Sequence, residues 1–454
     1  MENNEKIELF EHTPVTKAIM ILVIPTVLSS LVTVIYSLAD TYFVGMLNDP
    51  VENAAVTFVA TVILAFNAVN NLFGIGASSL MSRKLGEKDY QAVRKTSCIG
   101  FYASLFCSAM ISICCIFFYK PLIDLLGADS STFQATYEYM RWTVMCGAIP
   151  TILNVVMAYF VRAEGSALHA SIGTMSGCLL NILLDPFFIL PQFLNMGAEG
   201  AGLATFISNC IACTYFLILI KYKGNSTYVC LDPRLFSFDT FILKNIFIVG
   251  LPACIQNLLN VTGMTILNNM AGSYGTNAVA AMGICYKIYL VPLQIALGVS
   301  QGIMPLVSYS YSSKNYARMK ETITKSLKIV VVFGICMTLI LFINSRFFVH
   351  LFIDTKEVID YGQYFLKGYS LGILFIMIDF QFVHVFQAIG NGKISLIFAI
   401  LRKIILEIPF LLILDHFFPL YGLAYAQFLT EVILSIVGAL FVKNLFNKLK
   451  ESIN

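Results

Sequence analysis

Two acidic residues occupy long apolar stretches of the chain, where an ionised side chain is costly. Asp40 ends one such stretch and Asp185 lies within another. Asn181 precedes Asp185 by four residues and shares its helical face, and Pro186 removes a backbone donor and frees a carbonyl. These oxygens could cage a small hard cation, or share a proton because close, desolvated carboxylates do not both stay charged. Alternatively, both acids simply mark wetted helix ends.

The second half carries a different polar set within its apolar stretches. A charged residue there costs roughly 2.5–3.5 kcal/mol and usually faces a cavity or a partner. Lys287 and Asp379, on different predicted spans, are expected to form a buried ion pair that is either structural or facing a substrate. Arg402 and Lys403 are expected to extend along the helix to the membrane surface. The predicted substrate-cavity residues are Tyr36, Gln256, Asn260, Lys287 and Asp379.

Composition places the whole chain in a membrane. Of its 454 residues, 58% are hydrophobic and only 12% are charged, whereas a soluble domain has about 25% charged residues. The apolar content excludes a disordered chain. The formal net charge of +3 and the lack of a basic aromatic stripe argue against nucleic-acid binding. We therefore expect a polytopic membrane protein.

Twelve stretches are long and apolar enough to cross the hydrocarbon core as helices. Ten-residue strands of alternating polarity, typical of outer-membrane barrels, do not occur. The predicted fold is therefore all-α. The spans are predicted near residues 18–44, 54–80, 97–118, 138–161, 167–190, 200–220, 242–271, 278–305, 326–345, 366–388, 394–414 and 421–442.

The distribution of Lys and Arg predicts the orientation of these spans. If the N-terminus is cytoplasmic, loops on its side carry 21 of the 29 basic residues. The opposite loops carry Lys120, Arg346 and Lys356. Basic residues favour cytoplasmic loops, so both termini are predicted to be cytoplasmic.

An internal repeat divides the chain into two similar halves. The segment 82–90 (SRKLGEKDY) is followed 226 residues later by 308–316 (SYSYSSKNY). Each follows the second span of a six-span set, so the halves share one topology, as in transporters built from parallel repeats. The predicted organisation is two pseudo-symmetric six-helix bundles: an N-lobe at 1–220, a cytoplasmic linker at 221–240 and a C-lobe at 241–454.

Motifs for catalysis or nucleotide hydrolysis do not occur in the sequence. The chain contains no G-x-S-x-G, H-E-x-x-H or Walker A motif. We therefore expect a protein that is not an enzyme and needs no cofactor. Any pumping would draw on an ion gradient, where one charge crossing 100 mV supplies about 2.3 kcal/mol.

A series of motifs in order resembles the multidrug and toxic compound extrusion (MATE) family across essentially the full length. They are ADTYFVG at 39–45, SRKLGEKD at 82–89, RAEG at 162–165, NILLDP at 181–186 and GLP at 250–252. The segments FEHTPVTK at 10–17 and FQAIG at 386–390 are most similar to the MepA-like bacterial branch of that family.

The resemblance implies a multidrug efflux antiporter of a bacterial cytoplasmic membrane. Such a protein exports amphiphilic, often cationic, drug-like compounds in exchange for H⁺ or Na⁺ by alternating access, and we expect a monomer in the bilayer. By motif, Asp40, Asn181, Asp185 and Thr205 match the family's N-lobe cation site, and the first three are the only positions suggested for Na⁺. Gln256, Asn257 and Asn260 lie where some branches carry an acid, and Asp379 does not match the position of the family's acid in the tenth span, so a C-lobe cation site is not expected.

One rival function shares the same superfamily. A lipid-linked oligosaccharide flippase would need a cavity rich in Arg and Lys to bind pyrophosphate, and the first half has almost none within its spans. A membrane enzyme or sensor would need a catalytic cluster or an output domain. The sequence leaves the physiological substrate and the choice between H⁺ and Na⁺ open.

Overall fold

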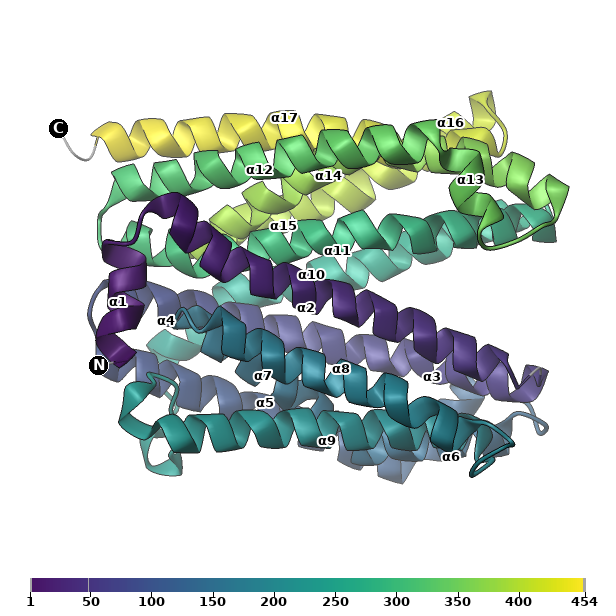
Figure 1. Cartoon of the computed structure of the whole chain (residues 1–454), viewed down its shortest axis with the longest axis horizontal. Coiled ribbons are helices and arrows are strands. Elements are labelled where there is room, and N and C mark those ends of the chain that lie inside the picture. The colour runs from purple at the N-terminus through teal and green to yellow at the C-terminus, as the bar shows by residue number, and fades with distance from the viewer. Residues whose placement is uncertain (1, 48, 452–454) are drawn as a thin grey trace. The chain divides into compact units, whose positions relative to one another are not determined.

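A computed structural model of the chain describes residues 2–47 and 49–451, and within these residues every regular element is a helix (Figure 1). In chain order the α-helices are α1 (Glu2–Glu11), α2 (Val15–Gly45), α3 (Pro50–Val69), α4 (Gly76–Gly86), α5 (Tyr90–Leu125), α6 (Phe133–Met140), α7 (Ala148–Ala163), α8 (Ala167–Ile189), α9 (Gly197–Lys223), α10 (Thr240–Gly272), α11 (Thr276–Ser312), α12 (Tyr316–Ile343), α13 (Ser345–His350), α14 (Lys356–Ala388), α15 (Gly392–Ile400), α16 (Ile408–Phe417) and α17 (Tyr421–Glu451). Three π-helical segments, η1 (Asn70–Ile75), η2 (Arg141–Cys146) and η5 (Leu401–Glu407), join consecutive α-helices, and two short 3₁₀ turns, η3 (Gly224–Ser226) and η4 (Pro233–Leu235), lie between α9 and α10.

Each of the twelve predicted spans coincides with helical chain. Ten helical segments of the described residues are long and apolar enough to cross a membrane, and the pair Phe133–Cys146 and Ala148–Ala163, bent by 46°, provides an eleventh. The remaining predicted span, 394–414, is formed by α15, η5 and α16 in succession. It differs from the others in its charge, because η5 contains Arg402, Lys403 and Glu407.

The chain forms two compact units, and two helices belong partly to each. Unit 1 consists of Met1–Thr13 and Leu28–Cys254, and unit 2 consists of Pro14–Val27 and Ile255–Asn454. The limits fall within α2 and α10, close to a proline in each helix, Pro25 and Pro252. A proline inside a helix removes one backbone hydrogen bond. In each of the two helices, the boundary between the units therefore lies close to a missing backbone hydrogen bond. The domain limits predicted from the sequence repeat, 1–220, 221–240 and 241–454, stay a prediction.

Glycines allow the exchanged half-helices to pack closely. In unit 1, a Cβ on Gly250 of α10 would lie 1.9 Å from the carbonyl oxygen of Leu72, and one on Gly76 would lie 2.4 Å from that of Ile246. In unit 2, a Cβ on Gly302 of α11 would lie 2.9 Å from Val23 Cα. Small residues let membrane helices approach until their backbones touch. The second span of each half therefore packs on the opening segment of the other half's first helix.

A buried carboxylate fastens α1 and the segment after α9 to the body of unit 1. Glu164 follows α7 and is 2% exposed. It accepts hydrogen bonds from Lys6 Nζ at 2.8 Å, from Thr227 Oγ1 at 2.8 Å and from the backbone nitrogen of Tyr228 at 2.7 Å. Burying a charge is tolerated when it is paired and fully hydrogen-bonded. This carboxylate therefore joins three segments that are distant in the sequence.

Helix α14 is the centre of unit 2. It packs against α11, α12 and α17, and its C-terminal half is almost wholly buried. Two of its buried polar side chains are hydrogen-bonded: Gln381 donates to Ser326 Oγ of α12 at 2.7 Å, and the ring nitrogen Nδ1 of His384 lies 2.8 Å from the carbonyl oxygen of Phe380. This helix therefore supplies the rigid frame for the polar groups of unit 2.

The contact between Gly250 and Leu72 predicts a large effect from a single methyl group. We expect Gly250→Ala to destabilise the protein by about 1–3 kcal/mol, because the new Cβ would meet a backbone carbonyl that cannot rotate away. Gly272→Ala on the same helix is the matched control, since a Cβ there has nothing within 4 Å. The midpoint of thermal unfolding of the purified protein measures both. Equal midpoints for the two variants would contradict the packing described here.

Candidate functional site

Two carboxylates, an amide and a hydroxyl meet inside unit 1, on α2, α8 and α9. Asp185 is 0% exposed and Asn181 is 2% exposed. With its amide nitrogen donating to Asp185 Oδ2 at 2.8 Å, Asn181 accepts through its oxygen from Thr205 Oγ1 at 3.2 Å and from Thr205 N at 3.1 Å. The i, i+4 spacing on α8 places the amide beside the carboxylate. The amide thus fixes Asp185 against α9.

Asp40 completes this group from α2. Its Oδ1 is buried and has no hydrogen-bond partner, and its charge interacts with that of Asp185. Among residues 2–47 and 49–451, neither carboxylate forms an ion pair with a basic side chain. Two like charges that share a poorly solvated space strongly favour uptake of a proton or a cation. All four residues predicted for the N-lobe cation site are therefore brought together.

Two tyrosines lie within electrostatic range of these carboxylates. Tyr36 interacts with Thr205 and with the charges of Asp40 and Asp185, as expected for a residue one turn before Asp40. Tyr139 of α6 is buried and lies within electrostatic range of both carboxylates and of Tyr36. Sequence reasoning did not find Tyr139, because a lone aromatic residue in an apolar stretch is indistinguishable from core packing.

The donors in unit 1 suit a light cation better than a transition metal. The described residues contain no group of three or more His, Cys, Asp or Glu side chains that could hold a metal ion. Na⁺ would need further oxygens beyond the two carboxylates, and Asn181 and Thr205 supply an amide and a hydroxyl beside them. Hard cations prefer such oxygen ligands. The same carboxylates could hold a proton without any further ligand.

Unit 2 contains a separate polar cavity of about 100 Å³. Its walls come from α10, α11, α14, η5 and α17, and they combine aromatic rings with charged groups. The residues that line it are Asn260, Met264, Leu267, Tyr286, Tyr289, Leu293, Tyr369, Ile376, Phe380, Arg402, Lys403, Glu407, Gln427 and Glu431.

Arg402 is the centre of the charge network in this cavity. It forms ion pairs with Asp379 of α14 and with Glu431 of α17, where Nε lies 3.2 Å from Oε1. Lys403 pairs with Glu407 at 2.6 Å. Arg402, Lys403 and Glu407 all lie in the π-helical η5, a type of segment that often occurs at functional sites. Asp379, Glu407 and Glu431 therefore have basic partners, unlike Asp40 and Asp185 of unit 1.

The structure corrects two expectations for the second half. Asp379 pairs with Arg402, so the predicted ion pair with Lys287 is wrong; the neighbouring span supplies the base instead. Arg402 is 3% exposed and does not extend to the membrane surface. Of the predicted cavity residues, Asn260 lines the cavity and Asp379 contacts it through Arg402, whereas Gln256 and Lys287 do not line it.

A helical membrane protein with two repeated units and a buried acidic site is typical of secondary transporters. The sequence model of the MatE family matches the chain twice, at residues 25–187 and 252–413, once in each half. The chain belongs to the MatE family, and is a multi-pass membrane transporter.

Relatives and solved structures agree with this assignment. The chain is 31% identical to the multidrug export protein MepA of Staphylococcus aureus (strain MRSA252), covering 98% of this chain and 97% of that protein. It is 30% identical to MepA of Staphylococcus haemolyticus over the same shares. The outward-facing structure of a multidrug resistance MATE family transporter has a TM-score of 0.92 at 26% identity, covering 98% of this chain and 99% of that chain. The predicted twelve-span fold is thereby confirmed.

Removing the central base of the unit 2 network should be costly. We expect Arg402→Met to destabilise the protein by about 3–5 kcal/mol, because Asp379 and Glu431 would stay buried without a basic partner. Adding Asp379→Asn and Glu431→Gln should restore most of the loss. Unfolding in denaturant measures the three variants.

The matched control is an exposed arginine in the same unit. Arg346 is 63% exposed and lies 3.7 Å from Asp360, so Arg346→Met should cost less than about 1 kcal/mol. A similar cost for Arg402→Met and Arg346→Met would show that the buried network contributes little.

Proposed function

We propose that this chain is a secondary active multidrug efflux antiporter. It exports amphiphilic, cationic organic compounds and imports H⁺ or Na⁺ in exchange, by alternating access. The observation that carries this proposal is a pair of carboxylates, the half-buried Asp40 and the fully buried Asp185, without a basic partner in the described chain. The multidrug export function named for the staphylococcal relatives supports the substrate class.

The charge of the carboxylate pair supplies the coupling. When the pair has lost its cation, two negative charges face each other in a poorly solvated space, and a cation from outside relieves the repulsion. Asp40 lies on the part of α2 that belongs to unit 1, and Pro25 lies on the part that belongs to unit 2. Cation binding at Asp40 would therefore bend or shift α2 near Pro25, where one backbone hydrogen bond is missing, and favour release of substrate outwards.

The flippase alternative is less well supported. A pyrophosphate group would need free basic side chains inside the transporter. In the unit 2 cavity, Arg402 and Lys403 are already paired with carboxylates, and the unit 1 site offers only acids and neutral groups. Both sites therefore suit a positively charged ligand better than an anionic one.

Dye transport in inverted membrane vesicles tests the proposal and identifies the ion. An acidic or Na⁺-rich lumen is imposed separately, and uptake of a fluorescent cationic dye is followed. Uptake driven by the pH gradient would identify Asp40 and Asp185 as a proton-binding site. Uptake driven by the Na⁺ gradient would identify their oxygens as ligands of Na⁺. Dye uptake that follows neither gradient would contradict the antiport mechanism.

Neutralising one carboxylate should abolish coupling and leave the fold intact. We expect Asp40→Asn to reduce gradient-driven dye accumulation by about 5–150-fold, the range for a lost coupling of 1–3 kcal/mol. Protein abundance in the membrane and the unfolding midpoint should stay as in the parent. Asp354→Asn is the matched control, because that side chain is 97% exposed. Normal export by the Asp40→Asn variant would remove Asp40 from the mechanism.

A further inference from the structure

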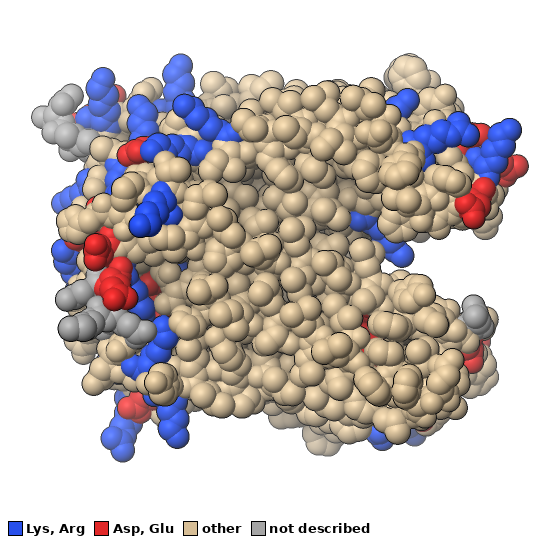
Figure 2. Space-filling view, in the orientation of Figure 1, with Lys and Arg blue, Asp and Glu red and all other residues tan. Residues whose placement is uncertain are grey.

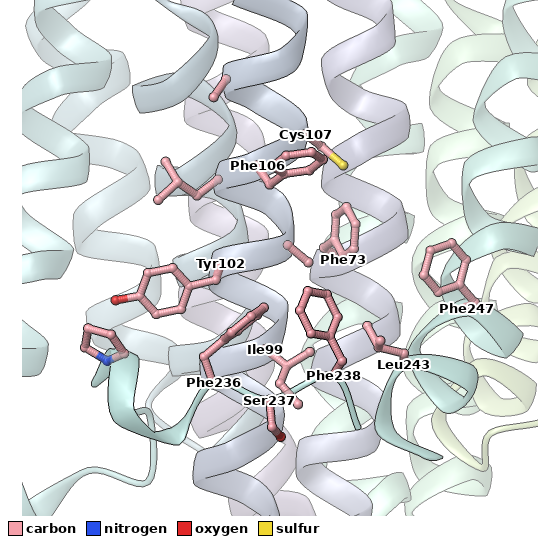
Figure 3. Close-up of a pocket in the computed structure, with 14 residues that line it drawn as sticks. Phe73, Ile99, Tyr102, Phe106, Cys107, Phe236, Ser237, Phe238, Leu243 and Phe247 are labelled. Atoms are coloured by element: carbon pink, nitrogen blue, oxygen red, sulfur yellow. The ribbon is translucent and has the colours of Figure 1, made fainter. Parts of the chain in front are cut away.

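Unit 1 contains an apolar cavity that is lined by none of the residues of the carboxylate site. Its volume is about 710 Å³. Its walls come from η1, α5, the segment between α9 and α10, and the start of α10. Figure 3 shows aromatic rings from these elements turned toward one space, among them Phe73, Tyr102, Phe236 and Phe238. We call this cavity the linker pocket.

The wall formed by the linker is held in place by hydrogen bonds to α5. Tyr102 donates its hydroxyl to the carbonyl oxygen of Leu231 at 2.9 Å, and Cys230 donates its backbone N–H to Ser97 Oγ at 2.9 Å. Lys95 donates to Asp239 Oδ2 at 2.8 Å, and this bond lowers the pKa of the Asp239 carboxyl below its ordinary value. The pocket is therefore built into unit 1, and Lys95 already has an anionic partner.

The dimensions of the linker pocket match one leaflet of a bilayer. Along α5 its lining residues run from Ile99 to Ala109, which corresponds to about 15 Å of helix. One leaflet contributes half of the roughly 30 Å hydrocarbon core. Helix α5 is itself a membrane span, and the lining residues Phe106 and Phe238 are 67% and 84% exposed. A groove of this length, open on a spanning helix, fits one acyl chain.

Two unpaired cations border the linker end of this pocket. Arg234 follows the lining residue Pro233, and Lys244 follows the lining residue Leu243. Both side chains are exposed, and within residues 2–47 and 49–451 neither has an ion-pair partner. The nearby acid Asp232 accepts from the backbone nitrogen of Arg234. Figure 2 shows Lys and Arg side chains gathered at the end of the chain's helices where Figure 1 labels α1.

We propose that the linker pocket binds an anionic phospholipid. One acyl chain lies along α5 between the phenylalanines of η1 and the linker, and Arg234 and Lys244 bind the headgroup phosphate. Basic residues near an anionic membrane surface are attracted to the lipid headgroups. The bound lipid would fill the space between α5 and the segment that connects α9 to α10.

Quenching of a single tryptophan by brominated lipid tests this proposal. Trp142, the one tryptophan of the chain, is replaced by Trp142→Phe, after a check that dye transport persists. Phe106→Trp then reports from the pocket, and Phe117→Trp, 75% exposed on the same helix outside the pocket, is the matched reporter. Nanodiscs of phosphatidylcholine contain a small fraction of phosphatidylglycerol with brominated acyl chains. We expect several-fold stronger quenching at position 106 than at position 117.

Substitutions in the pocket test binding of the acyl chain, and substitutions of Arg234 and Lys244 test binding of the headgroup. Arg234→Gln with Lys244→Gln should remove the excess quenching at position 106, whereas Lys221→Gln with Lys443→Gln, two other exposed lysines, should preserve it. Ala103→Phe, which fills the pocket, should also remove it. Equal quenching at the two positions would overturn the lipid site. Excess quenching that survives loss of Arg234 and Lys244, or that brominated phosphatidylcholine reproduces, would overturn headgroup recognition.

Discussion

Electrostatic repulsion between two buried carboxylates is the constraint on which the rest of the molecule depends. Within the described residues, Asp40 and Asp185 have no basic partner, whereas Asp379 and Glu431 of unit 2 both pair with Arg402. The two halves come from one repeat, and yet these buried acids differ in whether they have a basic partner. Asp40 and Asp185 are therefore suited to exchange ions, whereas the paired acids of unit 2 are suited to hold its helices together.

Because α2 and α10 each belong partly to both units, a movement of either helix in one unit also affects the other unit. The first part of α2 packs on Gly298 and Gly302 of unit 2, and its second part carries Asp40 into unit 1. The first part of α2 belongs to unit 2, and the first part of α10 belongs to unit 1. A proline lies close to the unit boundary in each helix. A cation that moves α2 at Asp40 therefore acts on a helix anchored in the other unit.

The sequence predicted the helical spans well because a bilayer demands long apolar helices, and the motif NILLDP led directly to Asn181 and Asp185. Spacing along one helix also placed the Asn181 amide beside Asp185 correctly. Contacts between distant helices were beyond such reasoning. Nothing in the sequence distinguishes Lys287 from Arg402 as the partner of Asp379, nor marks Tyr139 or the exchange of half-helices, because these depend on packing in three dimensions.

Ion release on substrate binding tests the coupling claim most directly. Purified protein in weakly buffered detergent solution is mixed with a cationic dye, and released H⁺ or Na⁺ is measured by an indicator or an ion-selective electrode. The account predicts stoichiometric release from the parent and none from the double variant Asp40→Asn with Asp185→Asn. Equal release from both proteins would contradict it, because the exchanged ion would then come from another site.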